Sequence, residues 1–259
     1  MKVAYKADNL NIHYSDEGNG DTIVLLHGWG ANIDVYKSIT DSLVPYFRVI
    51  ALDLPGFGKS DEPSFPYSVI DFAEFVIAFL KQLNIKTASF IGHSHGGRIT
   101  IEIASRNDNP FALEKIVLLD SAGIVPVKTS KQQFKIKCFK ASKWILNIPP
   151  VKALFPDALE KLKKRSGSAD YNAATPMMRQ SLVMAVNTDM RDKMPHIKVP
   201  CLLIWGEKDT ATPVSDGKLM ENFIPNSGLV LLQNAGHYSF LDNPYTFKKV
   251  LFSFFNIHT

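Results

Sequence analysis

One serine lies in a setting that is typical of a catalytic nucleophile, within the segment Phe90-Ile-Gly-His-Ser-His-Gly-Gly97. The apolar residues before Ser94 predict a strand, and the pattern after it predicts a helix. A sharp turn between a strand and a helix presents a serine hydroxyl at the end of a sheet. Gly92 and Gly96 fit this turn, because larger side chains two residues from the serine would collide. We therefore predict that Ser94 is a nucleophile.

A serine hydroxyl needs a base to take its proton, and His237 is the best-placed candidate. It follows the predicted strand Leu229–Leu232, at the edge of the sheet where the nucleophile emerges. His196 precedes a predicted strand and lies at the opposite edge, while His258 is the next-to-last residue of the sequence. We predict that His237 is the base, and the alternative is a loop histidine without a catalytic role.

The base in turn needs a carboxylate that orients its ring, and two aspartates follow predicted strands. Asp209 follows Cys201–Trp205, and Asp120 ends Ile116–Leu119. Both lie at the carboxyl ends of their strands, where α/β sheets place their sites. Asp209 is the favoured acid, and Glu207 is a lesser candidate. Asp120 stays open as a rival, with capping of the following turn as its other reading.

Backbone amides for a developing oxyanion are expected from two loops. The segment His27-Gly-Trp-Gly30 follows the predicted strand Thr22–Leu26, and its glycines let the backbone approach a substrate closely. We predict that the amides of Trp29 and His95 form an oxyanion hole. The indole of Trp29 either walls the substrate pocket or packs in the core.

Two other patterns suggest ligands but do not meet their requirements. The segment Gly56-Phe-Gly-Lys-Ser60 ends like a nucleotide-binding loop, but the position of the first glycine in that motif is Asp53. His93 and His95 flank the nucleophile, so their side chains point to opposite sides, and no carboxylate completes a metal site. We expect no metal and no organic cofactor.

The elements that must position these residues alternate along the chain. Apolar runs predict strands over 3–5, 10–14, 22–26, 47–52, 88–91, 116–119, 201–205 and 229–232, with a turn over 15–21. Helical periodicity appears over 69–83, 98–104 and 247–254. Alternating strands and helices predict a mostly parallel α/β sheet. The alternation stops between about 123 and 199, so we predict a core of 1–122 and 196–259 and a helical cap of 123–195.

Composition bounds the class of protein. The chain has 259 residues, is 46% hydrophobic and contains two cysteines, which excludes intrinsic disorder and a disulfide scaffold. No apolar leader and no apolar run of about 18 residues is visible, so we expect a cytoplasmic protein without stable membrane association. The net charge of +4 is uneven, with +9 over residues 128–165 and −5 elsewhere. This distribution argues against a nucleic-acid partner.

The basic segment belongs to the predicted cap. Residues 131–147 alternate lysines with apolar residues, and Phe134, Cys138 and Ile145 share one helical face. We expect a helix that packs on the core with its lysines in solvent. The alternatives are an anionic substrate or a transient contact with an anionic membrane. Met178 is expected to line or back the pocket, because methionine adapts to varied ligands.

Taken together, these motifs resemble the α/β-hydrolase superfamily. The resemblance covers most of the chain and rests on five segments: 27–30, 53–60, 92–97, 205–209 and 236–237. It implies an α/β-hydrolase fold, in which helices flank a mostly parallel eight-stranded sheet that carries an inserted helical cap. It also implies a triad of Ser94, His237 and Asp209. Epoxide hydrolases and haloalkane dehalogenases have aspartate at the nucleophile position, so Ser94 departs from them.

The resemblance leaves the reaction open among several classes. A serine hydrolase that cleaves a small carboxylic ester is the leading hypothesis. A C–C bond hydrolase is an alternative, as is the menaquinone-pathway lyase, whose elbow continues as Gly96-Gly-Arg98 does here. A non-catalytic ligand receptor is a third possibility. The expected partner is a small-molecule substrate bound by Trp29, Arg98 and Met178, and the protein is either a monomer or a homodimer.

Overall fold

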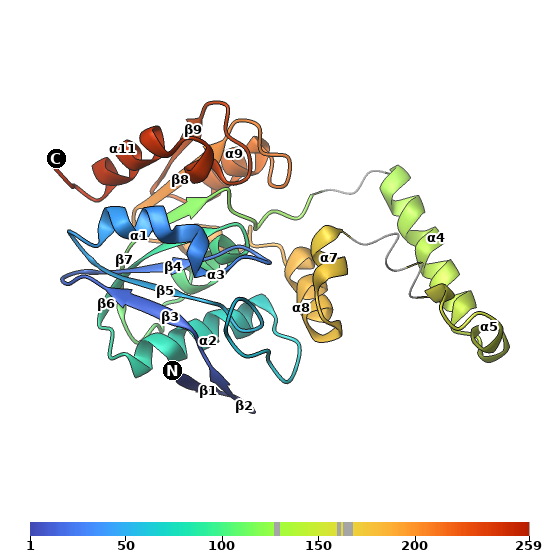
Figure 1. Ribbon diagram of the computed structural model, residues 1–259. Helices are drawn as coiled ribbons and strands as arrows, with labels where there is room; N and C mark the ends of the chain where they lie inside the picture. Colours follow the sequence, from blue (N-terminus) through green and yellow to red (C-terminus); the bar gives the residue numbers. More distant parts are fainter. Residues whose placement is uncertain (127–129, 160–161, 163–167, 259) are drawn as a thin grey trace.

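A computed structural model describes residues 1–126, 130–159, 162 and 168–258 (Figure 1). Its main sheet has seven strands in the order β3-β5-β4-β6-β7-β8-β9. All neighbouring pairs are parallel except β3 with β5. The strands are β3 (Tyr14–Glu17), β4 (Thr22–Leu26), β5 (Arg48–Leu52), β6 (Thr87–His93), β7 (Ala112–Leu119), β8 (Cys201–Gly206) and β9 (Ser227–Leu232).

The N-terminal strands differ from the prediction. β1 (Lys2–Tyr5) and β2 (Asp8–Asn11) form a separate two-stranded sheet, so the main sheet has seven strands rather than eight. The segment expected as a turn over 15–21 instead begins inside β3. This strand reads Tyr-Ser-Asp-Glu and lacks an apolar pattern, because it is an edge strand that only β5 contacts.

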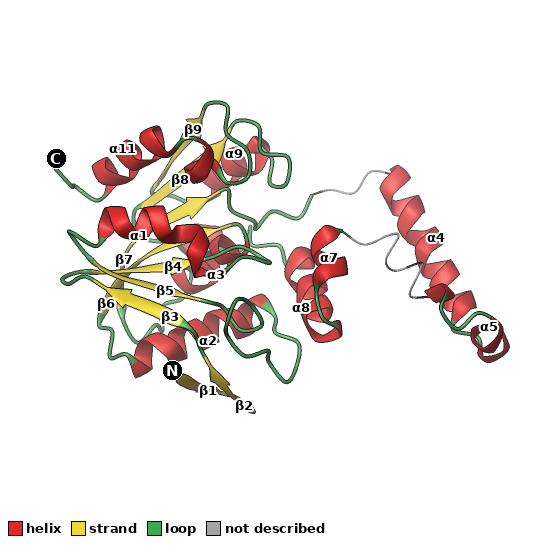
Figure 2. Ribbon diagram, in the orientation of Figure 1, coloured by secondary structure: helices red, strands yellow, loops and turns green. Residues whose placement is uncertain are grey.

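Helices cover both faces of the sheet, as Figure 2 shows. One face carries α2 (Val69–Gln82), α3 (His95–Ala104) and α9 (Val214–Phe223), and the other carries α1 (Lys37–Leu43), α10 (Ser239–Asp242) and α11 (Pro244–Phe254). Alternate residues of one strand enter the two cores: Val24 and Leu26 pack under α2 and α3, while Ile23 and Leu25 pack under α1 and α11. Strands buried on both faces explain the continuous apolar runs in the sequence.

Between β7 and β8 the described residues form helices and loops but no strand. These are α4 (Ser130–Leu146), α5 (Pro149–Leu154), α7 (Ala169–Ala173), α8 (Pro176–Asn187) and the short 3-10 helix η2 (Met194–His196); a second such helix, η1 (Ile33–Tyr36), precedes α1. The helical character predicted for this stretch agrees with the structure. The domain limits drawn from the sequence stay a prediction.

The helices of this insertion lie at different distances from the core (Figure 1). α8 packs on it, since Met178 and Leu182 are buried and Ser181 Oγ accepts a hydrogen bond of 2.9 Å from the amide of Tyr67. α4 and α5 extend away from the sheet, and we call residues 130–155 the arm. Within the described part of the chain, no helix combines the length and apolar character needed to cross a membrane.

Candidate functional site

The turn at Ser94 has the strained geometry that the glycine pattern predicts. Ser94 joins β6 to α3 with φ 49° and ψ −110°, a conformation that few non-glycine residues adopt. A Cβ atom on Gly96 would overlap the carbonyl oxygen of Leu26, and one on Gly92 would overlap Thr100 Oγ1. The amide of Ser94 donates to the carbonyl of Leu119 at 3.0 Å, which ties the turn to β7. The backbone therefore holds the serine at the carboxyl end of the sheet.

The structure brings Asp209 and His237 together at the same edge. Asp209 follows β8, His237 follows β9, and His237 Nδ1 lies 2.8 Å from Asp209 Oδ2. The other carboxylate oxygen accepts from the amides of Ala211 at 2.8 Å and Thr212 at 3.0 Å. Burial alone would raise the pKa of Asp209, but hydrogen bonds from His237 and Thr212 outweigh it, so the pKa lies below its ordinary value. Asp209 is therefore held as an anion against the imidazole.

His93, the residue before the serine, also contacts His237. Its Nε2–H donates to the carbonyl oxygen of His237 at 2.7 Å, and the two rings lie 4.9 Å apart. Burial lowers the pKa of His93 to about 3, so the ring is neutral. These contacts place the loop of His237 beside the nucleophile turn. Within the described residues, Ser94 Oγ makes no hydrogen bond to His237, and such bonds often tighten only when substrate binds.

The side chains of the two candidate oxyanion residues lie close together. The rings of Trp29 and His95 are 5.2 Å apart, and no described residue accepts a hydrogen bond from either backbone amide. His27 anchors the first of these loops, because its Nδ1 donates to the Gly28 carbonyl at 2.7 Å and its Nε2 accepts from the Leu54 amide at 2.9 Å. Burial lowers the pKa of His27 to about 4, so its neutral ring can donate a hydrogen bond through one nitrogen and accept one through the other.

The three predicted substrate contacts occupy different surroundings. The indole of Trp29 is half-buried and lies 4.9 Å from the ring of Phe57. Met178 of α8 is 3% exposed and packs where a Cβ of Gly56 would stand, so it joins the cap to the loop after β5. Arg98, one turn after Ser94 in α3, is buried without an ion pair among the described residues. The role of these three residues in substrate binding stays a prediction.

Several buried polar atoms beside the nucleophile have no hydrogen-bond partner among the described residues. They are Nδ1 of His93, which precedes Ser94, and Arg98 Nε with both ring nitrogens of His95, the last two residues being one turn apart in α3. Burial lowers the pKa of Arg98 to about 10, which still leaves a cation at neutral pH, and burial lowers that of His95 as well. Unpartnered buried polar atoms are costly, so this group can hydrogen-bond a polar ligand.

The rival acid has another structural role. Asp120 accepts hydrogen bonds from the Gly206 amide at 2.7 Å and from the amide and hydroxyl of Ser239 at 3.0 and 2.6 Å. These bonds connect β7, the end of β8 and the start of α10. Glu207 accepts only a long bond, 3.3 Å, from the amide of Asn234. Of the three carboxylates weighed from the sequence, Asp209 is the one that contacts His237.

The two patterns dismissed as ligand sites have structural explanations. Asp53 is buried and accepts from the amides of Lys59 and Ile33, each at 2.8 Å, so it closes the turn that resembles a phosphate loop. His93 packs on His237, whereas His95 packs on Trp29, which confirms that the flanking histidines face opposite sides. The described residues contain no cluster of side chains that could hold a metal ion.

Sequence reasoning missed two residues of this site. Thr212 donates through Oγ1 to Asp209 Oδ2 at 2.8 Å, and its Oγ1 also lies 3.3 Å from His237 Nδ1. His93 was weighed only as a metal ligand, yet it holds the carbonyl of His237. The position of Thr212, three residues after the acid, is the one local signal that could have suggested its contact.

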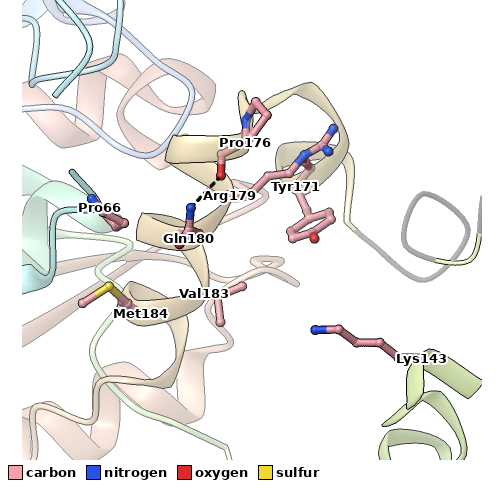
Figure 3. Close-up of a pocket in the computed structure, with 8 residues that line it drawn as sticks. All are labelled: Pro66, Lys143, Tyr171, Pro176, Arg179, Gln180, Val183 and Met184. Atoms are coloured by element: carbon pink, nitrogen blue, oxygen red, sulfur yellow. Dashed lines mark hydrogen bonds between the residues drawn. The ribbon is translucent and has the colours of Figure 1, made fainter. Parts of the chain in front are cut away.

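A cavity of about 650 Å³ lies elsewhere, between α4 and α8. Lys143 lines it from α4, and Arg179, Val183 and Met184 line it from α8, as Figure 3 shows. None of the three triad candidates lines this cavity. It separates the arm from α8 and does not belong to the nucleophile turn.

Comparison with known proteins identifies the family. A family model of the alpha/beta hydrolase fold matches residues 21–244. The chain belongs to the α/β-hydrolase family. As a member of it, the chain is similar to the uncharacterized hydrolase YugF of Bacillus subtilis, with 28% identity over 249 residues and 90% coverage of each chain.

Two further relatives carry descriptions of activity. A pimeloyl-[acyl-carrier protein] methyl ester esterase of Aliivibrio fischeri is 25% identical over 264 residues, covering 96% of this chain and 98% of its own. The solved structure of Est816, described as an N-acyl homoserine lactone degrading enzyme, is 25% identical with a TM-score of 0.74. That match covers 98% of this chain and all of the other. Both relatives share the hydrolase fold over nearly their full lengths.

Proposed function

We propose that this α/β hydrolase is a serine esterase that cleaves a small carboxylic ester with Ser94, His237 and Asp209. The observation that carries the proposal is the 2.8 Å contact between His237 and the buried Asp209, placed beside a strained serine turn. The descriptions of two relatives of about one-quarter identity, a methyl ester esterase and an enzyme that degrades N-acyl homoserine lactones, support it.

In the first half of this reaction, Ser94 Oγ attacks the ester carbonyl while His237 Nε2 takes the hydroxyl proton. Asp209 accepts Nδ1–H, which fixes the tautomer of His237 and stabilises the imidazolium. The amides of Trp29 and His95 donate to the oxyanion, each worth about 3 kcal/mol of the barrier. The C–O bond to the alcohol then breaks, and His237 returns the proton to the leaving oxygen.

The second half releases the acyl group. His237 takes a proton from water, whose oxygen attacks the acyl carbon of the ester on Ser94, and the same two amides receive the oxyanion. The bond to Ser94 Oγ breaks, and His237 gives the proton back to the serine. The protein supplies every group in this scheme, so it requires no metal or organic cofactor.

Substrate binding by Trp29, Arg98 and Met178 is part of the same proposal. Trp29 offers an aromatic wall, Met178 an adaptable apolar contact, and Arg98 a buried cation without an ion-pair partner among the described residues. The expected partner is a small-molecule substrate. We expect the protein in the cytoplasm, and cell fractionation tests this location. Sedimentation velocity distinguishes the monomer from the homodimer.

A second candidate follows from the unpartnered atoms beside the nucleophile. Arg98 Nε and the His95 ring can bind an anionic group, such as the carboxylate of a dienoate, which suits a C–C bond hydrolase or lyase using the same triad. A substrate panel of neutral esters of varied acyl length and one ring-fission dienoate discriminates these classes. Turnover of the dienoate with negligible ester hydrolysis favours the second candidate.

Replacement of the nucleophile tests the leading proposal. Ser94→Ala should lower kcat/KM for a p-nitrophenyl ester by at least about 10³-fold, because the covalent route is lost. Ser38→Ala, at an exposed serine of α1, is the matched control and should keep full activity. A fluorophosphonate probe should label the wild-type protein and the control but not Ser94→Ala. Retained turnover in Ser94→Ala would overturn the proposal, and absence of labelling in the wild type would support a receptor role.

A further inference from the structure

The arm has a strongly one-sided charge. Residues 130–155 contain six lysines and neither aspartate nor glutamate. Lys137, Lys140 and Lys143 of α4 are all exposed. The rest of the chain outside 128–165 carries a net charge of −5, so the arm is a basic extension of an acidic body. A surface of this kind is attracted to anionic partners.

The same helices expose large apolar side chains. Trp144 is 71% exposed, Leu154 72% and Phe134 68%, and Phe155 and Ile145 follow at 55% and 48%. Exposed aromatic and aliphatic side chains that gather in one short segment mark an interaction surface. Their alternation with lysines distinguishes them from an ordinary buried helix face.

The phase of α4 shows that two of these residues, Phe134 and Ile145, belong to one apolar stripe. Phe134, Cys138, Ala141 and Ile145 are spaced four, three and four residues apart, which places them on one face of the helix, and all four are exposed. Phe139 and Leu146, on the opposite side, are half-buried where α4 meets α5. The described residues therefore cover one side of α4 and leave its apolar stripe open.

Charge decides what can cover this stripe. A second copy would bring the same six lysines against it and repel. The nearest helix of the insertion, α8, has no acidic residue over 176–187, and Arg179 lines the cavity opposite Lys143 (Figure 3). An anionic lipid surface complements both features, since it attracts lysines and accepts aromatic side chains at the headgroup level.

We propose that the arm binds reversibly to an anionic membrane surface through Phe134, Trp144 and Leu154, with Lys137 and Lys140 at the lipid phosphates. Lysine side chains extend from an apolar stripe towards charged headgroups while their stems lie along it. Such contact is peripheral and lies on one side of the molecule, so it differs from the stable association that the sequence argues against.

Vesicle binding by the full-length chain tests this proposal. In a flotation assay, the protein should bind phosphatidylcholine vesicles that contain about one-third phosphatidylglycerol and not vesicles of phosphatidylcholine alone. High salt should weaken the binding, because screening reduces the lysine contribution. The triple variant Phe134→Ser, Trp144→Ser, Leu154→Ser should lose at least tenfold in binding while it keeps turnover of a soluble p-nitrophenyl ester.

Two variants that remove the same charge from different places test whether vesicle binding depends on the position of the lysines. The double variant Lys137→Gln, Lys140→Gln should weaken binding at least tenfold, whereas Lys86→Gln, Lys248→Gln removes two exposed lysines elsewhere and should change it less than twofold. Trp144 emission should shift to shorter wavelength with the anionic vesicles only. Equal binding to neutral vesicles, equal effects of the two lysine variants, or a concentration-dependent dimer without vesicle binding would each overturn the proposal.

Discussion

His93 is the residue whose role was hardest to anticipate. It donates to the carbonyl of His237 at 2.7 Å, and its neutral ring packs 4.9 Å from the His237 ring. Its Nδ1 has no partner among the described residues, and a Cβ on Gly28 would come within 2.8 Å of that atom. His93 thus fills the space between the loop of Gly28 and the loop of His237. We regard it as a positioning residue, because it acts through His237.

Replacement of His93 should therefore affect kcat more than KM. We expect His93→Phe to lower kcat at least about tenfold, because a base displaced by a fraction of an ångström transfers a proton poorly. The KM should change less than about twofold, since we expect Trp29, Arg98 and Met178 rather than this ring to contact the substrate.

His93→Gln provides the control, because its amide N–H can still donate to the carbonyl of His237. It should recover part of the lost kcat, as steady-state kinetics on a p-nitrophenyl ester can show. Equal losses in the two variants would contradict a positioning role and indicate a purely structural one.

The predicted triad residues came from a simple rule, since each of the three follows a strand that ends at the same edge of a parallel sheet. That rule found Ser94, Asp209 and His237, and the structure brings the last two into contact. It could not find His93 as a partner of His237, because these residues are 144 apart in the chain and no local pattern signals their contact. Long-range hydrogen bonds of this kind depend on packing alone.

Among the elements, the junction of β7, β8 and α10 depends on one carboxyl group. Asp120 accepts from two amides and one hydroxyl there and has φ 43°, so the backbone turns sharply at the same residue. Burial raises the pKa of Asp120 to about 7 despite these hydrogen bonds. Asp120, which holds the junction beside the loop of His237, therefore gains or loses its proton near neutral pH.

This raised pKa gives the stability of the protein a defined pH dependence. Between the ordinary value of 3.8 and about 7, the unfolded chain has released the proton of Asp120 while the folded chain still holds it. Its contribution to the free energy of unfolding is complete below this window and falls as the pH rises through it. Asp120→Asn cannot titrate, so it removes this contribution to the slope.

Urea unfolding of both proteins at several pH values measures the effect. The difference in unfolding free energy, wild type minus Asp120→Asn, should decrease steadily as the pH rises from about 4 to about 7. All other titrating groups are common to the two proteins and cancel to first order. A difference that stays constant across this range would mean that Asp120 is ionised throughout.

The nucleophile turn is the element with the least tolerance for added atoms. Gly96→Ala should lower the unfolding free energy by about 1–3 kcal/mol or more and abolish esterase activity, because the new methyl overlaps the Leu26 carbonyl. Gly228→Ala in β9 is the matched control, since no atom lies within 4 Å of its added Cβ. We expect that variant to stay within about 0.5 kcal/mol of the wild type. Similar losses in both variants, measured by urea unfolding, would argue against steric restriction at the turn.

Elements buried on both faces were the most predictable. β4 and β8 agree closely with their apolar runs, whereas the sequence predicts a turn over most of β3. An edge strand with polar side chains has no hydrophobic pattern, and its pairing with β5 comes from backbone hydrogen bonds that any sequence can form. The sequence does not predict β3 because an edge strand needs no hydrophobic pattern, and not because the segment is short.

At the scale of the whole molecule, the arm is the main departure from expectation. The apolar face of residues 131–147 predicts a helix packed on the core, and this prediction is wrong, since Phe134 and Ile145 of α4 are exposed. Figure 1 shows α4 and α5 extending from the body. An amphipathic pattern identifies which side of a helix is apolar but not which surface covers it.

Tryptophan fluorescence reports this arrangement without any lipid. Trp144 is 71% exposed, whereas Trp205 is fully buried and Trp29 half-buried. Trp144→Phe should shift the emission maximum to shorter wavelength and reduce quenching by acrylamide by about half. In urea, where all tryptophans are solvated, the two proteins should have the same emission maximum. Unchanged quenching in the folded variant would indicate that the arm is folded against the body in solution.

The distribution of the two thiols gives the natural chain a practical property. Cys138 is exposed on the stripe of α4, whereas Cys201 is buried in β8, where burial raises its pKa far above the ordinary value. A maleimide dye or a nitroxide spin label should therefore attach to the native sequence at one place, on the arm. The wild-type protein can thus be labelled site-specifically without mutagenesis, and the label reports directly on the environment of α4.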